Sequence, residues 1–508
     1  MNSRTKNTII NVVVTFGSQF MLAIINLLIR KTIIDYVGIE IFGIEGLFNS
    51  IMSLIYTLDL GIASASSYYY VLGISHNNDY QLKITYLAFR RLYRIISCII
   101  IFIDLIILMN LDNFVTSILV DSFTLRIVFV LVSASRLISF YKTPYENLLI
   151  YGQKQYIAQM VYLICGVIFS IFKLVFVYIY KSYIIYLFFV FIEGFTVYFF
   201  VKRNCFSFLN NENPCIADIK RREKEIIIYG LRIFINGYIC GFFVSKDNII
   251  INNLFGNDGL ILIAKASNYS IICSTVMTFA NSIMSALRAS VVNYINDKSV
   301  NSEENIINVF SIIFFVTFIM CCFCFIGLFG LSSPFISLLY GKNYLITNGY
   351  SFSFAFIASL ELFISSLLFY LTGKGKIDKE NILLIIDVVI TVTISYILVK
   401  LLGPLGTYIG TIIGYIIRIL FLLIIVSNDL KISLVVFTKK IAIYVVILIF
   451  DALVIYLSID QNVGNILDFV KLTFKCAVLF LLSISFFIKG DDFKSMKHIL
   501  LNKNKQQQ

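Results

Sequence analysis

The chain has 508 residues, of which 59% are hydrophobic and only 14% charged, a balance far from that of a soluble globular protein. Its net charge of +12 could indicate a nucleic-acid partner, so the distribution of the cations has to be considered. The loops between the apolar runs are too short to hold a folded catalytic or nucleotide-binding domain. Composition therefore excludes a soluble enzyme and places the function of the chain inside the bilayer.

Apolar runs with the length of a membrane-spanning helix follow one another along the whole chain. They are continuously apolar, without the alternation of transmembrane strands, so they predict helices. The first run, residues 8–29, contains no charge and is too long for a signal-peptide core, so we expect it to remain as the first span. In chain order we predict about fourteen spans, at 8–29, 42–70, 92–111, 123–140, 157–180, 183–201, 226–244, 260–287, 306–331, 350–371, 382–399, 403–426, 441–458 and 469–488.

The cations are distributed unevenly between the two sides of the membrane. If the amino terminus is inside, most Lys and Arg residues lie in cytoplasmic segments, and the outer segments hold only Arg30, Lys31, Lys181, Lys246, Lys342 and Lys400. The positive-inside rule then places both termini in the cytoplasm and favours an even number of spans. The basic charge is therefore a signal of topology, and we expect no nucleic-acid partner.

The longest and most basic loop, residues 202–225, follows the sixth predicted span. It separates an N-terminal lobe at 1–201 (spans one to six) from a C-terminal lobe at 226–426 (spans seven to twelve). Two additional spans and a cytoplasmic tail occupy 427–508. Because each lobe has an even number of spans, the two lobes are expected to have parallel topology.

In the twelfth predicted span, Gly406, Gly410 and Gly414 share one face of the helix. Small residues at this spacing let a neighbouring helix approach closely, so we interpret the three glycines as a packing surface rather than a ligand site.

The sequence contains no pattern for a metal or a cofactor. Ten cysteines form no framework, and Cys321, Cys322 and Cys324 lie inside an apolar run, where cysteine behaves as a small hydrophobic residue. Only two histidines occur, so a Cys/His metal site is not expected. Residues 373–376 (GKGK) lack the glycine spacing and the hydroxyl residue of a phosphate loop, so we predict no ATP hydrolysis.

Ionisable residues deep in a span require a reason, because each costs a few kcal/mol or more in hydrocarbon. The deep cations are Lys173 and Arg418, and the acids near mid-span are Asp59, Asp104, Glu193, Glu361 and Asp451. Each acid taken alone could be a protonated structural carboxyl, half of a buried pair, or a proton- or cation-binding site. Their number favours a bundle that encloses a polar path.

Several short motifs occur in the same order as in a known family of transporters. In the first hundred residues these are Arg30, residues 37–44 (VGIEIFGI), residues 58–63 (LDLGIA) and the basic stretch 90–93. Later ones are 247–251, 334–341 and 402–407. In these motifs the chain resembles Wzx-type oligosaccharide-lipid flippases, polysaccharide transporters of the multidrug/oligosaccharidyl-lipid/polysaccharide superfamily. It departs from them at residues 68–72 (YYYVL), where relatives often show a Leu-Tyr-Lys-Pro-like stretch.

The resemblance implies an all-α integral membrane protein with two six-helix lobes around a central cavity and two peripheral C-terminal helices. Spans one, two, seven and eight would line the cavity. The implied cargo is an undecaprenyl-pyrophosphate-linked oligosaccharide, a repeat unit of a cell-surface polysaccharide. It would be moved from the inner to the outer leaflet of the bacterial cytoplasmic membrane by alternating access, without catalytic residues or cofactor. The implied partners are this lipid-linked oligosaccharide, membrane lipids and other membrane proteins of polysaccharide assembly.

The same resemblance assigns residues to the substrate. Arg30 matches the family's arginine in span one, Lys265 occupies a place where related lipid carriers use a cation in span eight, and Arg232 in span seven is a third, weaker candidate. An arginine suits a pyrophosphate because its guanidinium presents a fork of donors that matches phosphate oxygens.

Asp59 and Glu45 are candidates for ion coupling. They are fourteen residues apart in the second predicted span, close to four helical turns, so they fall on nearly the same face. Asp59 could take up a proton or Na⁺. The membrane potential, worth about 2.3 kcal/mol per charge per 100 mV, is the other possible source of energy.

Two other functions stay open on the sequence. A cation-coupled multidrug exporter of the same superfamily would need an acidic and aromatic cavity, whereas Arg30, Arg232 and Lys265 favour an anionic cargo. An integral membrane glycosyltransferase or polysaccharide polymerase would need a sugar site on an external loop. The longest predicted outer loops, near 246–259 and 332–348, are too short to build one. Capsule, O-antigen and exopolysaccharide pathways are equally compatible with the chain.

Overall fold

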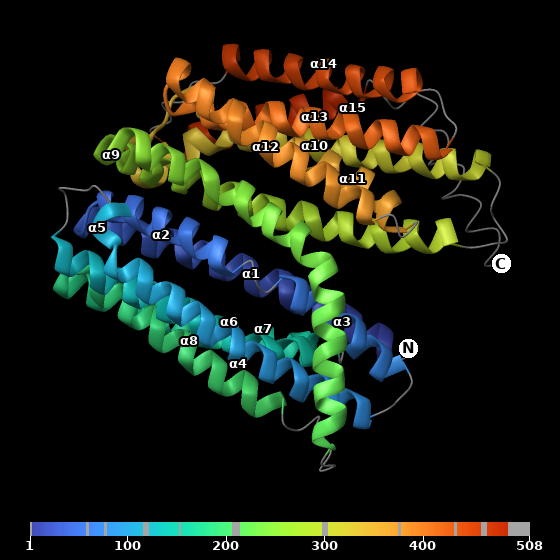
Figure 1. Ribbon diagram of the computed structural model, residues 1–508. Coiled ribbons are helices and arrows are strands. Elements are labelled where there is room, and N and C mark those ends of the chain that lie inside the picture. Colours follow the sequence, from blue (N-terminus) through green and yellow to red (C-terminus); the bar gives the residue numbers. More distant parts are fainter. Residues whose placement is uncertain are drawn as a thin grey trace. The chain divides into compact units, whose positions relative to one another are not determined.

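The computed structural model is helical nearly throughout the part of the chain that it describes (Figure 1), as the apolar runs predict. One short 3₁₀ helix, Lys342–Tyr344, is the exception among its helical elements. The structure describes residues 3–56, 60–75, 79–114, 121–151, 154–205, 214–296, 303–373, 377–430, 434–458 and 465–485. No strand occurs in these ranges, which confirms the all-α membrane class.

The chain divides into two compact units, Met1–Ala264 and Lys265–Gln508. The first contains α1 (Ser3–Tyr36), α2 (Glu40–Tyr56), α3 (Leu60–Ser75), α4 (Asp79–Met109), α5 (Leu111–Phe114), α6 (Ser122–Tyr151), α7 (Gln155–Tyr180), α8 (Tyr183–Cys205) and the first part of α9 (Ile216–Asn296). The second contains the rest of α9, then α10 (Glu303–Tyr340), α11 (Asn348–Gly373), α12 (Ile377–Leu402), α13 (Leu405–Leu430), α14 (Leu434–Ser458) and α15 (Ile466–Ser485). The predicted division into lobes at 1–201 and 226–426 stays a prediction.

Eleven helices within the described ranges are long and apolar enough to cross a membrane. The number rises to twelve if α2 and α3, which meet at an angle of 49°, form one broken span. The predicted spans at 226–244 and 469–488 account for the difference from the sequence. Side chains at 232–244 lie outside the described residues, and α15 carries Asp468, Lys471 and Lys475.

Several predicted cytoplasmic loops are helical in the structure. α4 begins at Asp79, so the basic stretch at 90–93 lies within a helix and not in a loop. Similarly, α8 runs to Cys205 and α9 begins at Ile216, so the predicted loop at 202–225 is partly helical. Lys, Arg and Glu are good helix formers. A polar stretch therefore ends an apolar run without ending the helix.

The N-terminal end of α6 is fixed by local polar contacts. Arg126 binds the carboxylate of Asp112 in α5 (Nη2–Oδ2 2.8 Å), and Ser122 donates to the same carboxylate (2.8 Å). These two donors hold the pKa of Asp112 below its ordinary value of 3.8. Arg126, which lies near the start of α6, therefore has an anionic partner there.

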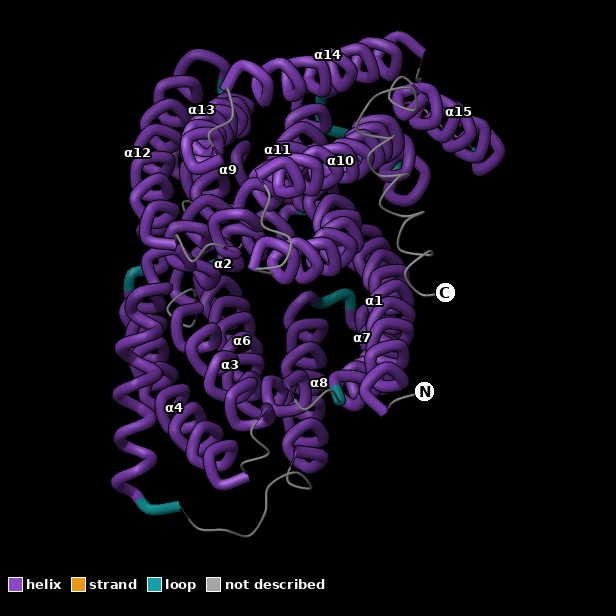
Figure 2. The backbone as a smooth tube through the Cα atoms, turned by 90° about the vertical axis from the view of Figure 1, so that its right-hand side faces the viewer, coloured by secondary structure: helices purple, strands orange, loops and turns teal. Residues whose placement is uncertain are grey.

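In the first unit, α4, α6 and α8 run side by side, and α7 packs against both α1 and α8 (Figures 1 and 2). The approach of α1 to α7 depends on Gly166, where an added Cβ would lie 2.5 Å from the Leu22 side chain. The core between α3, α4, α6, α7 and α8 is rich in aromatic residues, among them Tyr93 and Phe140, whose ring centroids are 4.4 Å apart. This packing positions α1, α2, α7 and α8 around the candidate site.

In the second unit, α12 and α13 form one of the closest helix pairs. Gly406, Gly410 and Gly414 of α13 face Leu398, Ser395 and Thr391 of α12. An added Cβ at Gly410 would lie 2.7 Å from the Cα atom of Ser395, closer than real Cβ contacts allow. The predicted packing role of these glycines is confirmed.

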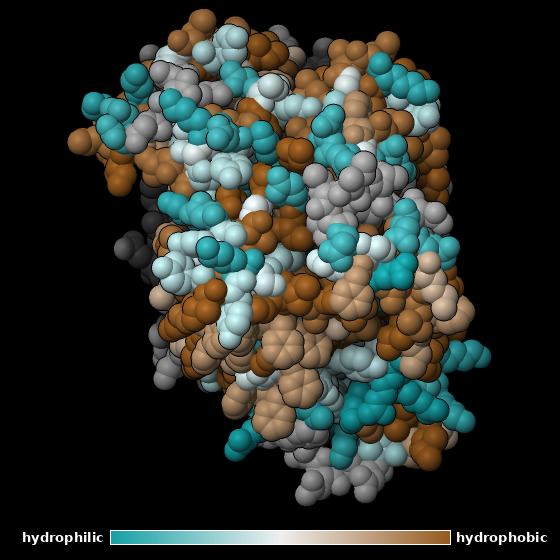
Figure 3. Space-filling view, turned by 90° about the vertical axis from the view of Figure 1, so that its left-hand side faces the viewer, coloured by the Kyte–Doolittle hydropathy of each residue, from teal (hydrophilic) through white to brown (hydrophobic). Residues whose placement is uncertain are grey.

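Many large apolar side chains remain on the surface of the helices. Phe102 is 65% exposed, Ile164 is 58% exposed and Leu457 is 82% exposed. Figure 3 shows apolar side chains spread over one face of the molecule, with hydrophilic side chains gathered in patches between them. Lipid acyl chains are the natural surroundings for such surfaces.

Candidate functional site

The candidate site begins at Arg30, which is only 8% exposed although it carries a permanent charge. Its guanidinium carbon lies 3.9 Å from the centroid of the Phe42 ring in α2, a cation–π contact. The sequence predicted Arg30 in an outer segment. In the structure α1 continues to Tyr36, so Arg30 lies within the helix. The ring shields one face of the guanidinium, which helps to explain why the helix tolerates this charge.

Two tyrosines at the start of α8 extend the site. Tyr183 packs edge-to-face on Phe42 (ring centroids 6.0 Å apart), and Tyr186 follows at 5.4 Å from Tyr183. Both hydroxyls lie within electrostatic reach of Arg30 and of Glu45 in α2. The Tyr183 hydroxyl is buried and lies close to the Glu45 carboxylate.

A buried ion pair completes the site. Lys173 of α7 binds Glu193 of α8 with Nζ and Oε2 2.5 Å apart, and the two side chains are 7% and 21% exposed. The Lys173 ammonium also lies 5.9 Å from the centroid of the Tyr186 ring. We call the resulting set the Arg30 cluster. Its members are Arg30, Phe42, Glu45, Lys173, Tyr183, Tyr186 and Glu193.

The Arg30 cluster brings two cations, two carboxylates and two phenol hydroxyls together from four helices. Such groups are expensive inside a membrane unless they pair or serve a ligand or ion path. Lys173 and Glu193 neutralise each other, whereas Arg30 rests on an aromatic face. The cluster could therefore bind an anionic group through Arg30 or a cation through its carboxylates.

The structure describes the side chains of only some of the predicted site residues. Arg30 and Glu45 come together in the Arg30 cluster. Asp59 lies outside the described residues, and so does the side chain of Arg232, whose backbone belongs to α9. Lys265 is half-buried at the first position of the second unit. Its pairing with Arg30 on one substrate stays a prediction.

Sequence reasoning missed the two tyrosines and did not assign Lys173 and Glu193 to the site. Tyr183 and Tyr186 are three residues apart and therefore share a helix face, which is the signal that could have pointed to them. Their neighbourhood with Arg30 could not be predicted, because it depends on how α8 packs against α2.

The other predicted mid-span charges also have neighbours. Asp104 of α4 accepts a hydrogen bond from Ser133 of α6, and Asp451 of α14 accepts one from Ser483 of α15 (2.7 Å). Glu361 lies within electrostatic reach of Arg418. In the described ranges no group of three or more His, Cys, Asp or Glu residues could hold a metal ion.

A polar seam joins α2 to the first part of α9. Asn248 donates to the Ser50 hydroxyl (2.9 Å), and the hydroxyls of Ser53 and Ser245 lie 2.9 Å apart. The adjacent Lys246 side chain is 1% exposed and binds Asp247 at 2.6 Å. The segment near 246–259, predicted as an outer loop, is helical in the structure, and the Lys246–Asp247 pair lies within α9. Its one non-helical residue is Gly256 (φ 53°, ψ −123°).

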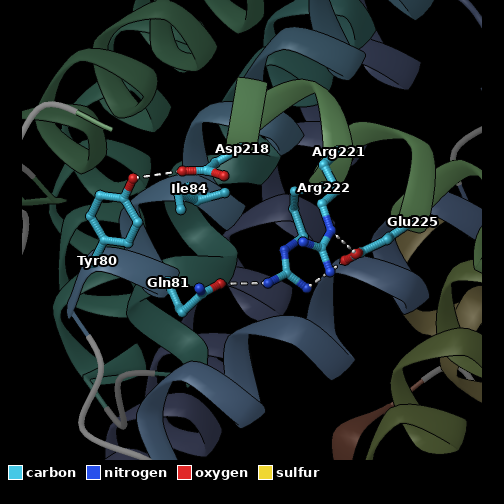
Figure 4. A pocket seen from close by; sticks show the side chains of 7 residues that line it. All are labelled: Tyr80, Gln81, Ile84, Asp218, Arg221, Arg222 and Glu225. Carbon is cyan, nitrogen blue, oxygen red and sulfur yellow. Dashed lines mark hydrogen bonds and ion pairs between the residues drawn. The ribbon is translucent and has the colours of Figure 1, made fainter. Parts of the chain in front are cut away.

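A pocket of about 310 Å³ lies between the first turns of α4 and α9 (Figure 4). Across it, the Tyr80 hydroxyl donates to Asp218 (2.8 Å), and Arg222 donates to Gln81 (2.5 Å) and binds Glu225 (2.9 Å). The acids and arginines of this pocket offset each other. We interpret it as a contact that fastens α9 to α4 and not as a substrate site.

No protein-family model matches the sequence, and no curated protein matches it. Solved structures do match. A multidrug resistance MATE family transporter of the MOP superfamily, in an inward-facing conformation, shares 16% identity and has a TM-score of 0.62. That match covers 83% of this chain and 99% of the other. A MOP superfamily transporter from Pyrococcus furiosus, described as having a binding pocket of reverse polarity, shares 14% identity over 83% of this chain and 95% of its own, with a TM-score of 0.58.

These matches define the fold of the chain, which is the one that these MOP-superfamily transporters have. Within it, one particular match is to the lipid II flippase MurJ in an inward closed conformation. It has a TM-score of 0.69 at 15% identity and covers 95% of this chain and 99% of MurJ. At these identities the likeness establishes the fold.

Proposed function

We propose that the chain is a flippase that moves an undecaprenyl-pyrophosphate-linked oligosaccharide from the inner to the outer leaflet by alternating access. The observation that carries the proposal is the buried Arg30. A permanently charged fork at 8% exposure, inside a helix that can span the membrane, suits the phosphate oxygens of a lipid-linked cargo.

Coverage by similar structures supports a lipid carrier. The match to the lipid II flippase reaches 95% of this chain, whereas the match to the inward-facing multidrug transporter reaches 83%. Both cover 99% of the other protein. The difference is of the order of one helical hairpin, the size of the α14–α15 pair.

The proposal assigns roles to the remaining candidates. Lys265 and Arg232 would supply further positive charge to the pyrophosphate. Glu45, which lies near the same tyrosines as Arg30, and Asp59 would take up the coupling ion. Substitution of one of these phosphate-binding cations should lower the transport rate more than it lowers the amount of protein produced.

A cation-coupled multidrug exporter of the same fold is the second candidate. The carboxylates of Glu45 and Glu193 favour it, since both lie beside tyrosine rings in the Arg30 cluster. Carboxylates and aromatic faces are the groups that hold organic cations. Lys173, however, already neutralises Glu193 at 2.5 Å.

Transport of a fluorescent undecaprenyl-pyrophosphate oligosaccharide in proteoliposomes tests the proposal. The native chain should expose the lipid in the opposite leaflet, and Arg30→Ala should slow this at least tenfold, about 1.4 kcal/mol. Arg30→Lys should recover only part of the rate, because an ammonium lacks the planar fork.

Lys31→Ala is the matched control, because Lys31 is the next cation along α1 and lies outside the Arg30 cluster. It should transport at the native rate. Native flipping by Arg30→Ala would remove Arg30 from the mechanism. Efflux of an organic cation without flipping of such lipids would establish the multidrug alternative.

A further inference from the structure

A second pocket, separate from the Arg30 cluster, is lined by cations and tyrosines. It has a volume of about 200 Å³ and lies between α4, α6 and α8. The residues that matter are Arg90 and Arg94 of α4, Tyr141 and Tyr145 of α6, and Tyr198 and Lys202 of α8. None of its lining residues is acidic.

The three cations of this pocket differ from the neighbouring cations Arg91 and Lys142 in their ion pairing. Arg91, next to Arg90, binds Glu223 at 3.5 Å, and Lys142 binds Glu146 at 3.7 Å. In the part of the chain that the structure describes, no such ion pair involves Arg90, Arg94 or Lys202. Three cations held near one another without an anion repel, so a bound anion would stabilise the pocket.

The tyrosines form the wall against which the cations lie. Tyr145 and Tyr198 pack edge-to-face with ring centroids 5.8 Å apart, and the Lys202 ammonium is 5.5 Å from the centroid of Tyr198. The charge of Arg90 reaches the Tyr145 hydroxyl. Hydroxyl donors beside guanidinium and ammonium groups are the set that phosphate oxygens accept from.

The depth of the pocket corresponds to a membrane surface. Arg94 precedes the end of α4 by fifteen residues and Lys202 follows the start of α8 by nineteen, which is about 22 and 28 Å of helical rise. These lengths approach the ~30 Å of a hydrocarbon core. Lys, Arg and Tyr gather at this level in membrane proteins, on the side that the positive-inside rule assigns to the cytoplasm.

Exposed apolar side chains occur on the same two helices, on the mid-helix side of the lining cations Arg94 and Lys202. Ile95 and Ile99 of α4 are 51% and 49% exposed, and Phe195 and Phe199 of α8 are 55% and 54% exposed. A ligand with acyl chains could cover these side chains while its headgroup occupies the pocket. A free phosphate ion could not, so the arrangement favours a lipid.

We propose that the pocket between α4, α6 and α8 binds the phosphate headgroup of an anionic phospholipid of the cytoplasmic leaflet. At about 200 Å³ it is smaller than the ~300 to 1,000 Å³ typical of sites for drug-sized ligands. A phosphate headgroup fits it and a whole oligosaccharide does not. The site is distinct from the transport path, and its occupant is a resident lipid.

Native mass spectrometry of the purified full-length protein with phosphatidylglycerol tests this site. The combined Arg90→Gln and Lys202→Gln variant should lower the apparent affinity for phosphatidylglycerol about twenty-five-fold, since each cation near an anionic lipid contributes roughly fivefold. Arg94→Gln alone should lower it about fivefold. Because Arg94 is exposed, that variant changes the charge without disturbing the core.

Arg203→Gln is the matched control, since Arg203 is exposed, adjoins Lys202 and does not line the pocket. It should bind phosphatidylglycerol as the native chain does, and phosphatidylcholine should bind weakly to all variants. Native lipid binding by both pocket variants, or an equal loss in Arg203→Gln, would overturn the proposal. Displacement of the lipid by millimolar inorganic phosphate would assign the pocket to a free anion and also overturn it.

Discussion

At the scale of single residues, the first unit accommodates the buried cations Lys173 and Arg30 by different contacts. Lys173 has a carboxylate at 2.5 Å, whereas Arg30 lies 3.9 Å from the face of a phenylalanine ring. The Lys173–Glu193 ion pair satisfies both charges within the protein, so we assign Lys173 to the framework around the site. We assign Arg30 to substrate because its buried guanidinium presents a planar fork that suits phosphate oxygens.

Breaking the Lys173–Glu193 pair should therefore affect stability. Lys173→Met leaves Glu193 buried without its cation and should cost about 3 to 5 kcal/mol. The double variant Lys173→Met with Glu193→Met should recover most of this loss, because paired apolar replacements are often neutral. Unfolding of the detergent-solubilised protein in SDS titrations measures both. A double variant as unstable as the single one would show that the two charges are not coupled.

Among the site residues, sequence could identify those that are unusual in themselves. A lysine deep inside an apolar run is conspicuous, which identifies Lys173 as a deep cation, and Arg30 is identified by the family resemblance. Tyr183 and Tyr186 are ordinary residues in a chain with 31 tyrosines. Their importance comes from contact with Phe42 across two helices, and no local pattern encodes that contact.

At the scale of elements, the most specific helix contact is that of α12 with α13. Gly410 faces the Ser395 backbone at a distance that leaves no room for a side chain. This contact was predictable because four-residue spacing of glycine fixes a helix face regardless of the partner. The partner helix itself was not predictable, since many neighbouring spans could have supplied a flat surface.

Substitution at Gly410 should separate these two helices. Gly410→Val forces them apart and should abolish the folded protein or lower its thermal unfolding temperature in detergent by more than ten degrees, as expected for a loss of several kcal/mol. Gly327→Ala is the control, because Gly327 of α10 has open space where a Cβ would be placed. It should be neutral or slightly stabilising, since alanine favours a helix over glycine. Equal effects of the two variants would argue against the packing explanation.

Helix ends were the least predictable feature of the elements. Hydropathy finds the stretch that lies in hydrocarbon, but α4 starts at Asp79, well before its apolar run. The extra turns carry Arg90, and Arg94 follows one turn later in the same helix, which is why the proposed lipid pocket involves a helix and not a loop. A hydropathy scan finds the membrane spans, but it does not show that Arg90 and Arg94 lie on the same helix.

At the scale of the whole molecule, cytoplasmic termini stay a prediction of the positive-inside rule. The outer cations of that prediction include Arg30 and Lys246, and both are buried in the structure. Without them the predicted outer set consists of Lys31, Lys181, Lys342 and Lys400, so the predicted asymmetry becomes larger.

Reporter fusions measure this orientation. Alkaline phosphatase fused after Lys181, in the turn between α7 and α8, should be active because it reaches the periplasm. A fusion after Arg203, near the end of α8, should be inactive, and green fluorescent protein at the carboxyl terminus should fluoresce. The reverse pattern would invert the topology and would place the proposed lipid pocket in the outer leaflet.

The tyrosine wall of the lipid pocket also has an optical consequence. The chain contains no tryptophan, so it has none of the background indole fluorescence of most membrane proteins of this size. A single Tyr141→Trp exchange would place the only indole of the molecule beside Arg90, Arg94 and Lys202. Its fluorescence would then report the occupancy of one site, without a covalent dye and without a background from the other spans.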